Sequence, residues 1–300
     1  GSRSVTYQSH HFDKICKYKK YNSMLKKKQL IIFMPSIEVG GVEKNLFLIS
    51  NYLSTKLRGI KLITANKKDK KFFKKIQLIS PKSEFWQSKS RFQKYLICLF
   101  LLVKILIQNR NTVVFAFQAN LYCIIICKIF KVKVIIRSNT SPIGWSKNII
   151  KKYLYKKILS YADKIIVNSL DFKNQFKTIF SIKVECIYNP LDKEYIQKKS
   201  KEKLIFPFFK KQKCLKLINV ARLTEQKDHL TLLKALYLIK NKLDFRMLIL
   251  GEGPHKNQLV NFINTHDLNK KVKIINFKKN KFKFIKSSNI FVLTSKFEGL

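Results

Sequence analysis

The sequence predicts a two-domain α/β protein built on parallel sheets. The chain has 300 residues, of which 46% are hydrophobic, which is enough for two buried cores and too many for a disordered protein. Short apolar runs alternate with longer segments of helical periodicity along most of the sequence. The apolar runs are continuous, as is typical of parallel strands that helices cover on both faces.

Residues 1–23 are basic and polar, and we expect them to lie outside the fold as an extension or, alternatively, as a basic surface anchor. The first domain is predicted over residues 24–190. After its first strand, a loop with Gly40 and Gly41 leads into a helix over 42–54, whose apolar residues share one face. The strands expected in this domain cover residues 29–35, 60–65, 112–117, 132–137, 163–168 and 183–189.

Ser169 is expected to cap a further helix of this domain. The segment 191–213 is polar and rich in Lys at its start and contains Pro207, so we predict that it connects the two domains. The second domain is predicted over 214–300, with Asp228 as a helix cap. Its expected strands cover residues 215–222, 245–251, 271–277 and 290–295, and its helices 229–242, 255–266 and 281–288.

Several polar residues and glycines lie at or shortly after the carboxyl ends of the second domain's strands. They are Arg222, Lys227, Gly251, Gly253 and Glu298. Parallel strands end at a common edge of the sheet, and ligands of open α/β sheets bind outside that edge. We therefore expect these residues to line a binding site.

The second domain resembles the carboxyl-terminal domain of glycosyltransferase family 4 in three segments, NVARLTEQKD, LILGEGP and LTSKFEGL. The resemblance covers roughly residues 24–300. It implies the GT-B fold, in which two Rossmann-like domains with parallel sheets face a central cleft. It also implies retaining transfer of a hexose or N-acetylhexosamine from a UDP- or GDP-linked donor. The second domain would bind the donor and the first domain the acceptor.

Arg222 and Lys227 are the predicted ligands of the donor diphosphate. When the sugar departs, negative charge grows on a phosphate oxygen, and either a divalent metal or fixed cations must neutralise it. No two Asp residues have the D-x-D spacing of a metal site. By the resemblance, Arg222 and Lys227 match the Arg and Lys that grip the diphosphate. We expect a metal-independent enzyme without a cofactor; the alternative is that both residues are ordinary surface cations.

Glu298 is predicted to hold the donor sugar. A carboxylate can accept hydrogen bonds from sugar hydroxyls and so keep the donor in its reactive pose. By the resemblance, Glu298 is the first Glu of an E-x7-E motif, and the second Glu would lie beyond Leu300. We therefore expect an incomplete second domain and an inactive fragment. The alternative is that Glu298 is a solvated loop residue.

Two pairs of glycines are candidates for donor contacts. Gly40 and Gly41 lie where a strand turns into a helix, and glycine lets the backbone approach a phosphate closely. They do not form G-x-G-x-x-G, so a dinucleotide site is not indicated. By the resemblance they lie near the diphosphate, and Gly251 and Gly253 shape a loop that faces the nucleotide. Structural turns are the alternative for both pairs.

The first domain departs from the family pattern at one point. Many members carry a His after a strand, beside the reacting sugar, but no His lies between His11 and His229. The strand predicted at 132–137 ends in Arg137-Ser138-Asn139 at this position. We expect Arg137 and Asn139 on the acceptor side of the site, without an assigned role.

The formal net charge of +45 is compatible with nucleic acid, an anionic membrane surface or a polyanionic substrate as partner. Lys is spread along the whole chain, so much of this charge is also explained by an AT-rich coding bias. The apolar segment 91–110 has basic ends and is either a buried helix or a helix on a bilayer surface. Six Cys without metal spacing indicate a reducing compartment, and Cys123 and Cys127 are expected in the core.

The leading interpretation is a bacterial transferase of polysaccharide biosynthesis, such as lipopolysaccharide or capsule synthesis. It would be cytoplasmic, peripheral to the inner face of the membrane, and would use a glycan or lipid-linked acceptor without binding nucleic acid. One alternative is a basic nucleic-acid-binding protein, although no binding module is evident. Another is a GT-B-like isomerase or epimerase of sugar nucleotides.

Overall fold

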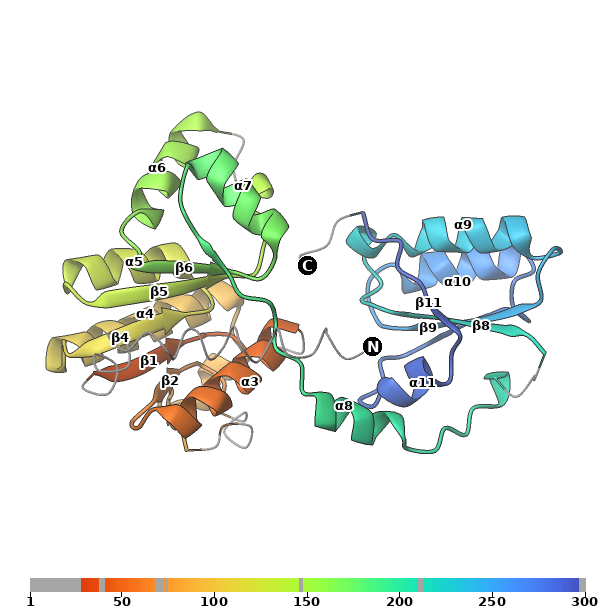
Figure 1. Ribbon diagram of the computed structural model, residues 1–300, viewed down its shortest axis with the longest axis horizontal. Coiled ribbons are helices and arrows are strands. Elements are labelled where there is room, and N and C mark those ends of the chain that lie inside the picture. The colour runs from red at the N-terminus through yellow and green to blue at the C-terminus, as the bar shows by residue number, and fades with distance from the viewer. Residues whose placement is uncertain are drawn as a thin grey trace, which may run out of the picture. The chain divides into compact units, whose positions relative to one another are not determined.

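The computed structural model describes residues 28–37, 41–67, 73, 75–145, 148–209 and 213–296 (Figure 1). The chain divides into two compact units, between Leu191 and Asp192. Each unit is an α/β structure on a parallel sheet. The predicted extension 1–23, Gly40 and Glu298 lie outside the described residues.

In the described part of the first unit, seven parallel strands form a sheet in the order β3-β2-β1-β4-β5-β6-β7. The strands are β1 (Gln29–Phe33), β2 (Lys61–Ile63), β3 (Gln77–Ile79), β4 (Thr112–Ala116), β5 (Lys133–Ser138), β6 (Lys164–Val167) and β7 (Glu185–Cys186). Each of the six predicted strands is present, five of them in shorter form and β5 shifted by one residue. The sequence did not predict β3, because this edge strand is only partly buried and gives a weak apolar signal.

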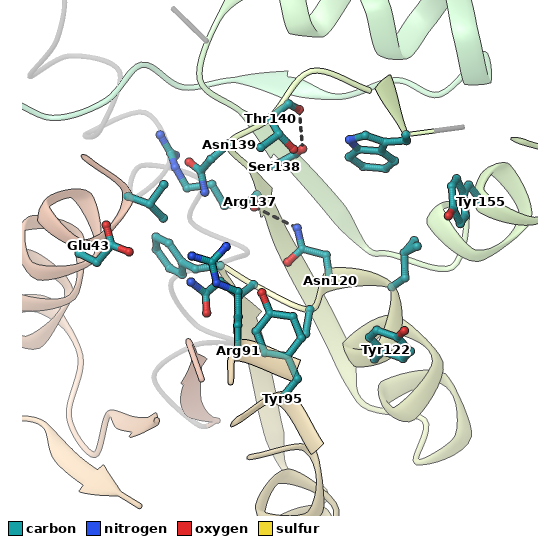
Figure 2. Close-up of a pocket in the computed structure, with 16 residues that line it drawn as sticks. Glu43, Arg91, Tyr95, Asn120, Tyr122, Arg137, Ser138, Asn139, Thr140 and Tyr155 are labelled. Carbon is teal, nitrogen blue, oxygen red and sulfur yellow. Dashed lines mark hydrogen bonds between the residues drawn. The ribbon is translucent and has the colours of Figure 1, made fainter. Parts of the chain in front are cut away.

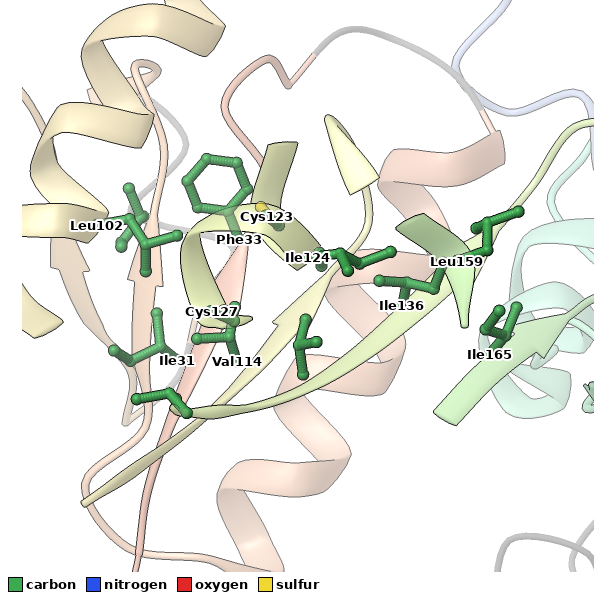
Figure 3. Close-up of a cluster of buried hydrophobic side chains, with 14 of the residues drawn as sticks. Ile31, Phe33, Leu102, Val114, Cys123, Ile124, Cys127, Ile136, Leu159 and Ile165 are labelled. Carbon is green, nitrogen blue, oxygen red and sulfur yellow. The ribbon is translucent and has the colours of Figure 1, made fainter. Parts of the chain in front are cut away.

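The helices of the first unit cover both faces of its sheet. They are α3 (Gly41–Lys56), α4 (Arg91–Gln108), α5 (Asn120–Ile129), α6 (Ile149–Leu159) and α7 (Leu170–Phe180). The chain runs from β1 to β2 in one direction and from β4 through β7 in the other. Right-handed connections therefore place α3 on one face and α4 to α7 on the opposite face. The two faces have separate cores, and Figure 3 shows the one beneath α4 to α7.

Local signals set the ends of these helices. Ser169 accepts a hydrogen bond from the amide of Phe172 at 3.2 Å, which confirms the predicted cap of α7. Ser90 and Gln93 form a capping box at the start of α4, which was not among the caps predicted from the sequence. These caps fix where the helices begin, and thereby which residues face the sheet.

The cysteines of α4 and α5 belong to the apolar core. Cys98, Cys123 and Cys127 are fully buried, which confirms the predicted packing role of the last two. Burial raises the pKa of the Cys98 and Cys127 thiols to about 12, since a thiolate would lose its hydration there. These thiols are therefore protonated at neutral pH. Among the described helices, none has the length and hydropathy needed to cross a membrane.

The described part of the second unit has a four-stranded parallel sheet in the order β10-β9-β8-β11. Its strands are β8 (Leu215–Val220), β9 (Phe245–Leu250), β10 (Val272–Ile275) and β11 (Ile290–Phe291). Its helices are α8 (Lys193–Ser200), α9 (His229–Ile239), α10 (Lys256–Thr265) and α11 (Phe282–Lys286). All predicted elements of this domain are present, and α9 and α10 share one apolar core.

Part of the segment predicted as a connection, 191–213, is built into the second unit. Its helix α8 packs against α11. The Asn280 side-chain amide donates hydrogen bonds to the carbonyl of Lys199 at 2.9 Å and to Glu202 Oε2 at 2.7 Å. Phe209 is buried in a core beneath the sheet with Ile218. The segment thus covers the sheet face opposite to α9 and α10.

Candidate functional site

In each sheet, as far as the structure describes it, the strands that follow along the chain are added first on one side of a strand and later on its other side, which creates a topological switch point. In the first sheet this point lies between β1 and β4, and in the second between β8 and β11. At such a point the connections leave toward opposite faces, and a crevice opens at the carboxyl ends of the two strands. The candidate site residues of each unit should therefore be sought in the loops that follow these strands.

In the second unit, the loop after β8 carries Arg222 and Lys227. The Arg222 side chain is exposed, and Lys227 ends the short helix η5 (Glu225–Lys227). Asp228 follows in the left-handed conformation and caps α9, accepting from the Thr231 amide at 3.3 Å and from its hydroxyl at 2.9 Å. The predicted cap is confirmed, and both cations lie at the carboxyl edge of the sheet. Their contact with a diphosphate stays a prediction.

The loop after β9 touches the Arg222 loop backbone to backbone. The Leu223 amide donates to the Glu252 carbonyl at 2.9 Å, and the His255 amide donates to the Leu223 carbonyl at 3.1 Å. A Cβ atom at Gly251 would lie 1.9 Å from the carbonyl oxygen of Ala221. One at Gly253 would lie 2.3 Å from the carbonyl oxygen of Leu223. Any larger residue at Gly251 or Gly253 would clash with the backbone of the Arg222 loop, so close packing by itself accounts for both glycines.

The segment after β11 is tied to the same turn. The Thr294 hydroxyl donates to the Asp228 carbonyl at 2.9 Å, and the Lys296 amide donates to the Gln226 carbonyl at 2.9 Å. The Lys296 ammonium also pairs with Glu225 at 3.0 Å, and this hydrogen bond holds the pKa of the Glu225 carboxyl below its usual range. These contacts hold the end of the described segment against the Lys227 turn, and the predicted sugar carboxylate, Glu298, lies outside the described residues.

A small cavity of about 150 Å³ lies beside this turn, and no sequence pattern predicted it. His229, Thr224 and His255 contribute to its wall. His229 Nε2 lies 2.9 Å from Asn219 Oδ1, and the Asn219 amide nitrogen donates to the Val292 carbonyl. Oδ1 therefore accepts, Nε2 carries the proton, and the buried Nδ1 has no protein partner. Burial lowers the pKa of His229.

In the first unit, a pocket of about 520 Å³ opens at the carboxyl ends of β4 and β5 (Figure 2). Residues from the starts of α3, α4 and α5 complete its wall. Aromatic and polar side chains both contribute, among them Tyr95, Tyr122, Trp145, Tyr155, Asn120 and Asn139. Aromatic faces beside amide groups suit the apolar and hydroxyl faces of a sugar.

Arg137 and Asn139 both contribute to this pocket, but they are placed differently. Arg137 is only 1% exposed, and its Nη2 donates to the Ile187 carbonyl at 3.1 Å and to Asn189 Oδ1 at 2.9 Å. Burial lowers the Arg137 pKa to about 10. This guanidinium therefore holds the chain after β7 against the end of β5. Asn139 has a buried side-chain oxygen without a protein partner.

Two further residues, Gln118 and Gly41, belong to the segments that follow β4 and β1. Gln118 forms a two-point bridge to Ser36, accepting from its amide at 3.0 Å and donating to its carbonyl at 2.9 Å. This bridge joins the loops after β1 and β4. Gly41 begins α3, and a Cβ atom there would meet no atom within 4 Å. The described surroundings of Gly41 thus leave room for a ligand or a side chain.

Over the residues that the structure describes, no group of three or more His, Cys, Asp or Glu could hold a metal ion. Metal independence itself stays a prediction. The charges placed at the carboxyl edge of the second sheet include Arg222, Lys227 and Lys296, with Glu225 paired to the last.

Comparisons with known proteins agree with this arrangement. The family model described as Glycosyltransferase Family 4 matches residues 39–195, and the model described as Glycosyl transferases group 1 matches residues 200–300. An uncharacterised glycosyltransferase of Methanocaldococcus jannaschii is 34% identical over 197 residues, which span 59% of this chain and 47% of that protein. The chain thus matches about half the length of this relative.

A second relative, from Campylobacter jejuni, is 29% identical over 90% of this chain and 75% of its own length. Its name is N-acetylgalactosamine-N,N'-diacetylbacillosaminyl-diphospho-undecaprenol 4-alpha-N-acetylgalactosaminyltransferase. Among solved structures, Anabaena HepE in complex with UDP and glucose has a TM-score of 0.67 and 14% identity, covering 91% of this chain and 76% of that one. Because the first family model covers more than half of the chain, this protein belongs to glycosyltransferase family 4, and its fold is GT-B.

Proposed function

We propose that this protein transfers a hexose or N-acetylhexosamine from a UDP- or GDP-linked donor to a lipid-linked saccharide or another cell-envelope glycan. The observation that carries the proposal is the turn at 222–228. It presents two cations at the switch point of the second sheet, and backbone contacts from two other loops hold it in place. A preformed cationic loop of this kind suits a diphosphate, whose charge grows as the sugar leaves.

The donor role belongs to the second unit. Arg222 offers a planar fork of donors and Lys227 a compact charge, so together they can hold two phosphate oxygens. The Anabaena structure with UDP and glucose supports a UDP-linked donor as the first one to test. With these two cations to offset the charge of the diphosphate, we propose metal-independent transfer with retention at the sugar carbon.

The acceptor role belongs to the first unit. Its pocket combines aromatic walls with Asn120 and Asn139, whose side-chain oxygens are buried without protein partners. Unpartnered acceptors of this kind can receive hydrogen bonds from sugar hydroxyls. The Campylobacter relative is named for a diphospho-undecaprenol acceptor, which supports a lipid-linked saccharide here. We further propose a role in bacterial polysaccharide synthesis at the inner face of the membrane.

The proposal is tested by donor binding, which needs no acceptor. Isothermal titration with UDP-N-acetylglucosamine, UDP-glucose, UDP and GDP should show binding that a chelator leaves unchanged. Arg222→Ala and Lys227→Ala should each weaken it at least about tenfold, because each removes a charge-assisted contact worth about 1.5–3 kcal/mol. Lys234→Ala, at an exposed position of α9, is the matched control and should bind as the parent protein does.

Two results would oppose the proposal. Equal affinity in the parent and both site variants would remove Arg222 and Lys227 from the site. Conversion of a donor into an isomeric sugar nucleotide without any acceptor would favour the isomerase or epimerase interpretation instead.

A further inference from the structure

The outer faces of α4 and α6 expose large apolar side chains. On α4, Phe92, Leu96 and Phe100 follow one another at intervals of four residues and form one stripe, with Phe100 64% exposed. On α6, Ile149 and Ile150 are 82% and 78% exposed. A single exposed apolar residue is ordinary on a protein surface, but a contiguous group marks an interaction site.

These side chains lie on one side of the first unit. The inner faces of α4, α5 and α6 all contribute to the same core, and α5 packs against both α4 and α6. Their outer faces therefore point away from the same side of the sheet. On α5, which lies between them, Ile125 and Ile129 are exposed as well. We call the exposed side chains of these three helices the α4–α6 face.

The charged residues of the α4–α6 face are all basic. On α6, Lys151, Lys152, Lys156 and Lys157 are all exposed. Neither Asp nor Glu occurs within α4, α5 or α6 as the structure defines them. The lysines lie among the apolar residues of α6, so one surface offers both apolar groups and fixed cations.

We propose that the α4–α6 face docks on an anionic lipid bilayer. Its isoleucines and phenylalanines enter the boundary between headgroups and acyl chains, and its lysines contact lipid phosphates. The chain remains peripheral, because this face lies along the bilayer surface. The proposal concerns binding to lipid alone and is independent of the transferase proposal.

Charge distinguishes a bilayer from other occupants. A two-fold dimer through this face would bring two copies of the same basic, acid-free helices together, and like charges would oppose each other. A nucleic acid would pair with the lysines but would leave Ile149 and Ile150 without apolar partners. An anionic bilayer offers acyl chains to the apolar side chains and phosphates to the lysines.

The experiment is co-sedimentation of the whole chain with vesicles at about 0.15 M salt. We expect binding to vesicles of phosphatidylcholine and phosphatidylglycerol in about equal amounts, and much weaker binding to phosphatidylcholine alone. A variant carrying Lys151→Gln, Lys152→Gln, Lys156→Gln and Lys157→Gln should partition at least about tenfold less. The pair Ile149→Gln and Ile150→Gln should lose about tenfold as well.

Matched controls lie on the second unit. Lys234→Gln, Lys242→Gln, Lys270→Gln and Lys278→Gln remove the same charge from other exposed positions. Leu238→Gln removes an apolar side chain that is 73% exposed on α9. Both controls should bind as the parent protein does. Because all substituted residues are exposed, thermal unfolding should be unchanged in every variant.

A second measurement reports insertion directly. Ile150→Trp should gain fluorescence quenching by brominated lipids relative to the parent protein, whereas Leu238→Trp should not. Equal loss of binding in the α6 variants and their controls would overturn the proposal, because charge anywhere would then suffice. Equal binding to neutral vesicles, or a dimer that the α6 variants dissociate without any vesicle binding, would overturn it too.

Discussion

The two switch-point sites differ in what holds them together. In the second unit, three loops meet through main-chain hydrogen bonds, and two glycines allow the backbones to touch. In the first unit, long side chains add to the main-chain bonds: Gln118 bridges the loops after β1 and β4, and Arg137 holds the chain after β7. A site built from backbone needs particular residues at fixed spacing. A site built from side chains can be made by many residue combinations.

The strongest test of this comparison is Gly251→Ala. The added Cβ would lie 1.9 Å from the Ala221 carbonyl oxygen, so the loop must move and its hydrogen bonds must weaken. We expect a loss of about 3 kcal/mol or more in the free energy of unfolding of the second unit, measured by urea denaturation. Gly41→Ala is the control, since its Cβ meets nothing within 4 Å, and it should be neutral or slightly stabilising.

Arg137→Met tests whether side chains hold the first unit's site. The substitution keeps an apolar stem but leaves the Ile187 carbonyl and Asn189 without their donor. We expect a cost of about 2 kcal/mol, with faster amide hydrogen exchange in β5 and β7 and no change in the second unit. Asn139→Ala should change stability by less than about 0.5 kcal/mol. Equal effects of the two substitutions would contradict the bridging role of Arg137.

The buried His229 predicts a pH dependence confined to the second unit. Its pKa is lowered in the folded state, so at mildly acidic pH the unfolded chain binds more protons than the folded chain. The contribution of His229 is fully present above about pH 6.5 and is lost as pH falls below that value. Urea denaturation between about pH 7.5 and 5 measures the slope. His229→Gln should flatten it and His266→Gln should not; an unchanged slope in His229→Gln would assign it to other groups.

The smallest effect is expected for Lys296→Ala. The ion pair with Glu225 is exposed to solvent, and such pairs add little to stability. The Lys296 amide still donates to the Gln226 carbonyl after the substitution. We expect no measurable change in the free energy of unfolding. A clear loss would mean that side chains, and not only backbone contacts, hold the second unit's site.

The same contrast explains which features could be predicted from the sequence and which could not. The sequence predicted the positions of Arg222, Lys227, Gly251 and Gly253 at one sheet edge, because parallel strands share the direction of their carboxyl ends. It predicted the caps Ser169 and Asp228 because a cap depends on neighbours three residues away. It did not predict the Asn219–His229 contact, since a strand residue and a helix residue meet there only after folding.

By itself, the sequence determined the α/β class, most of the strands along the chain and the placement of Arg222, Gly251 and Gly253 at one sheet edge, because these depend on local periodicity and glycine spacing. The tertiary structure decided which face each helix covers. It thereby decided that one side of α4 is core and the other is exposed. It also decided that Arg137 is a buried bridge, because its partners at Ile187 and Asn189 lie about 50 positions further along the chain. Such contacts form only when the sheet brings distant strands together.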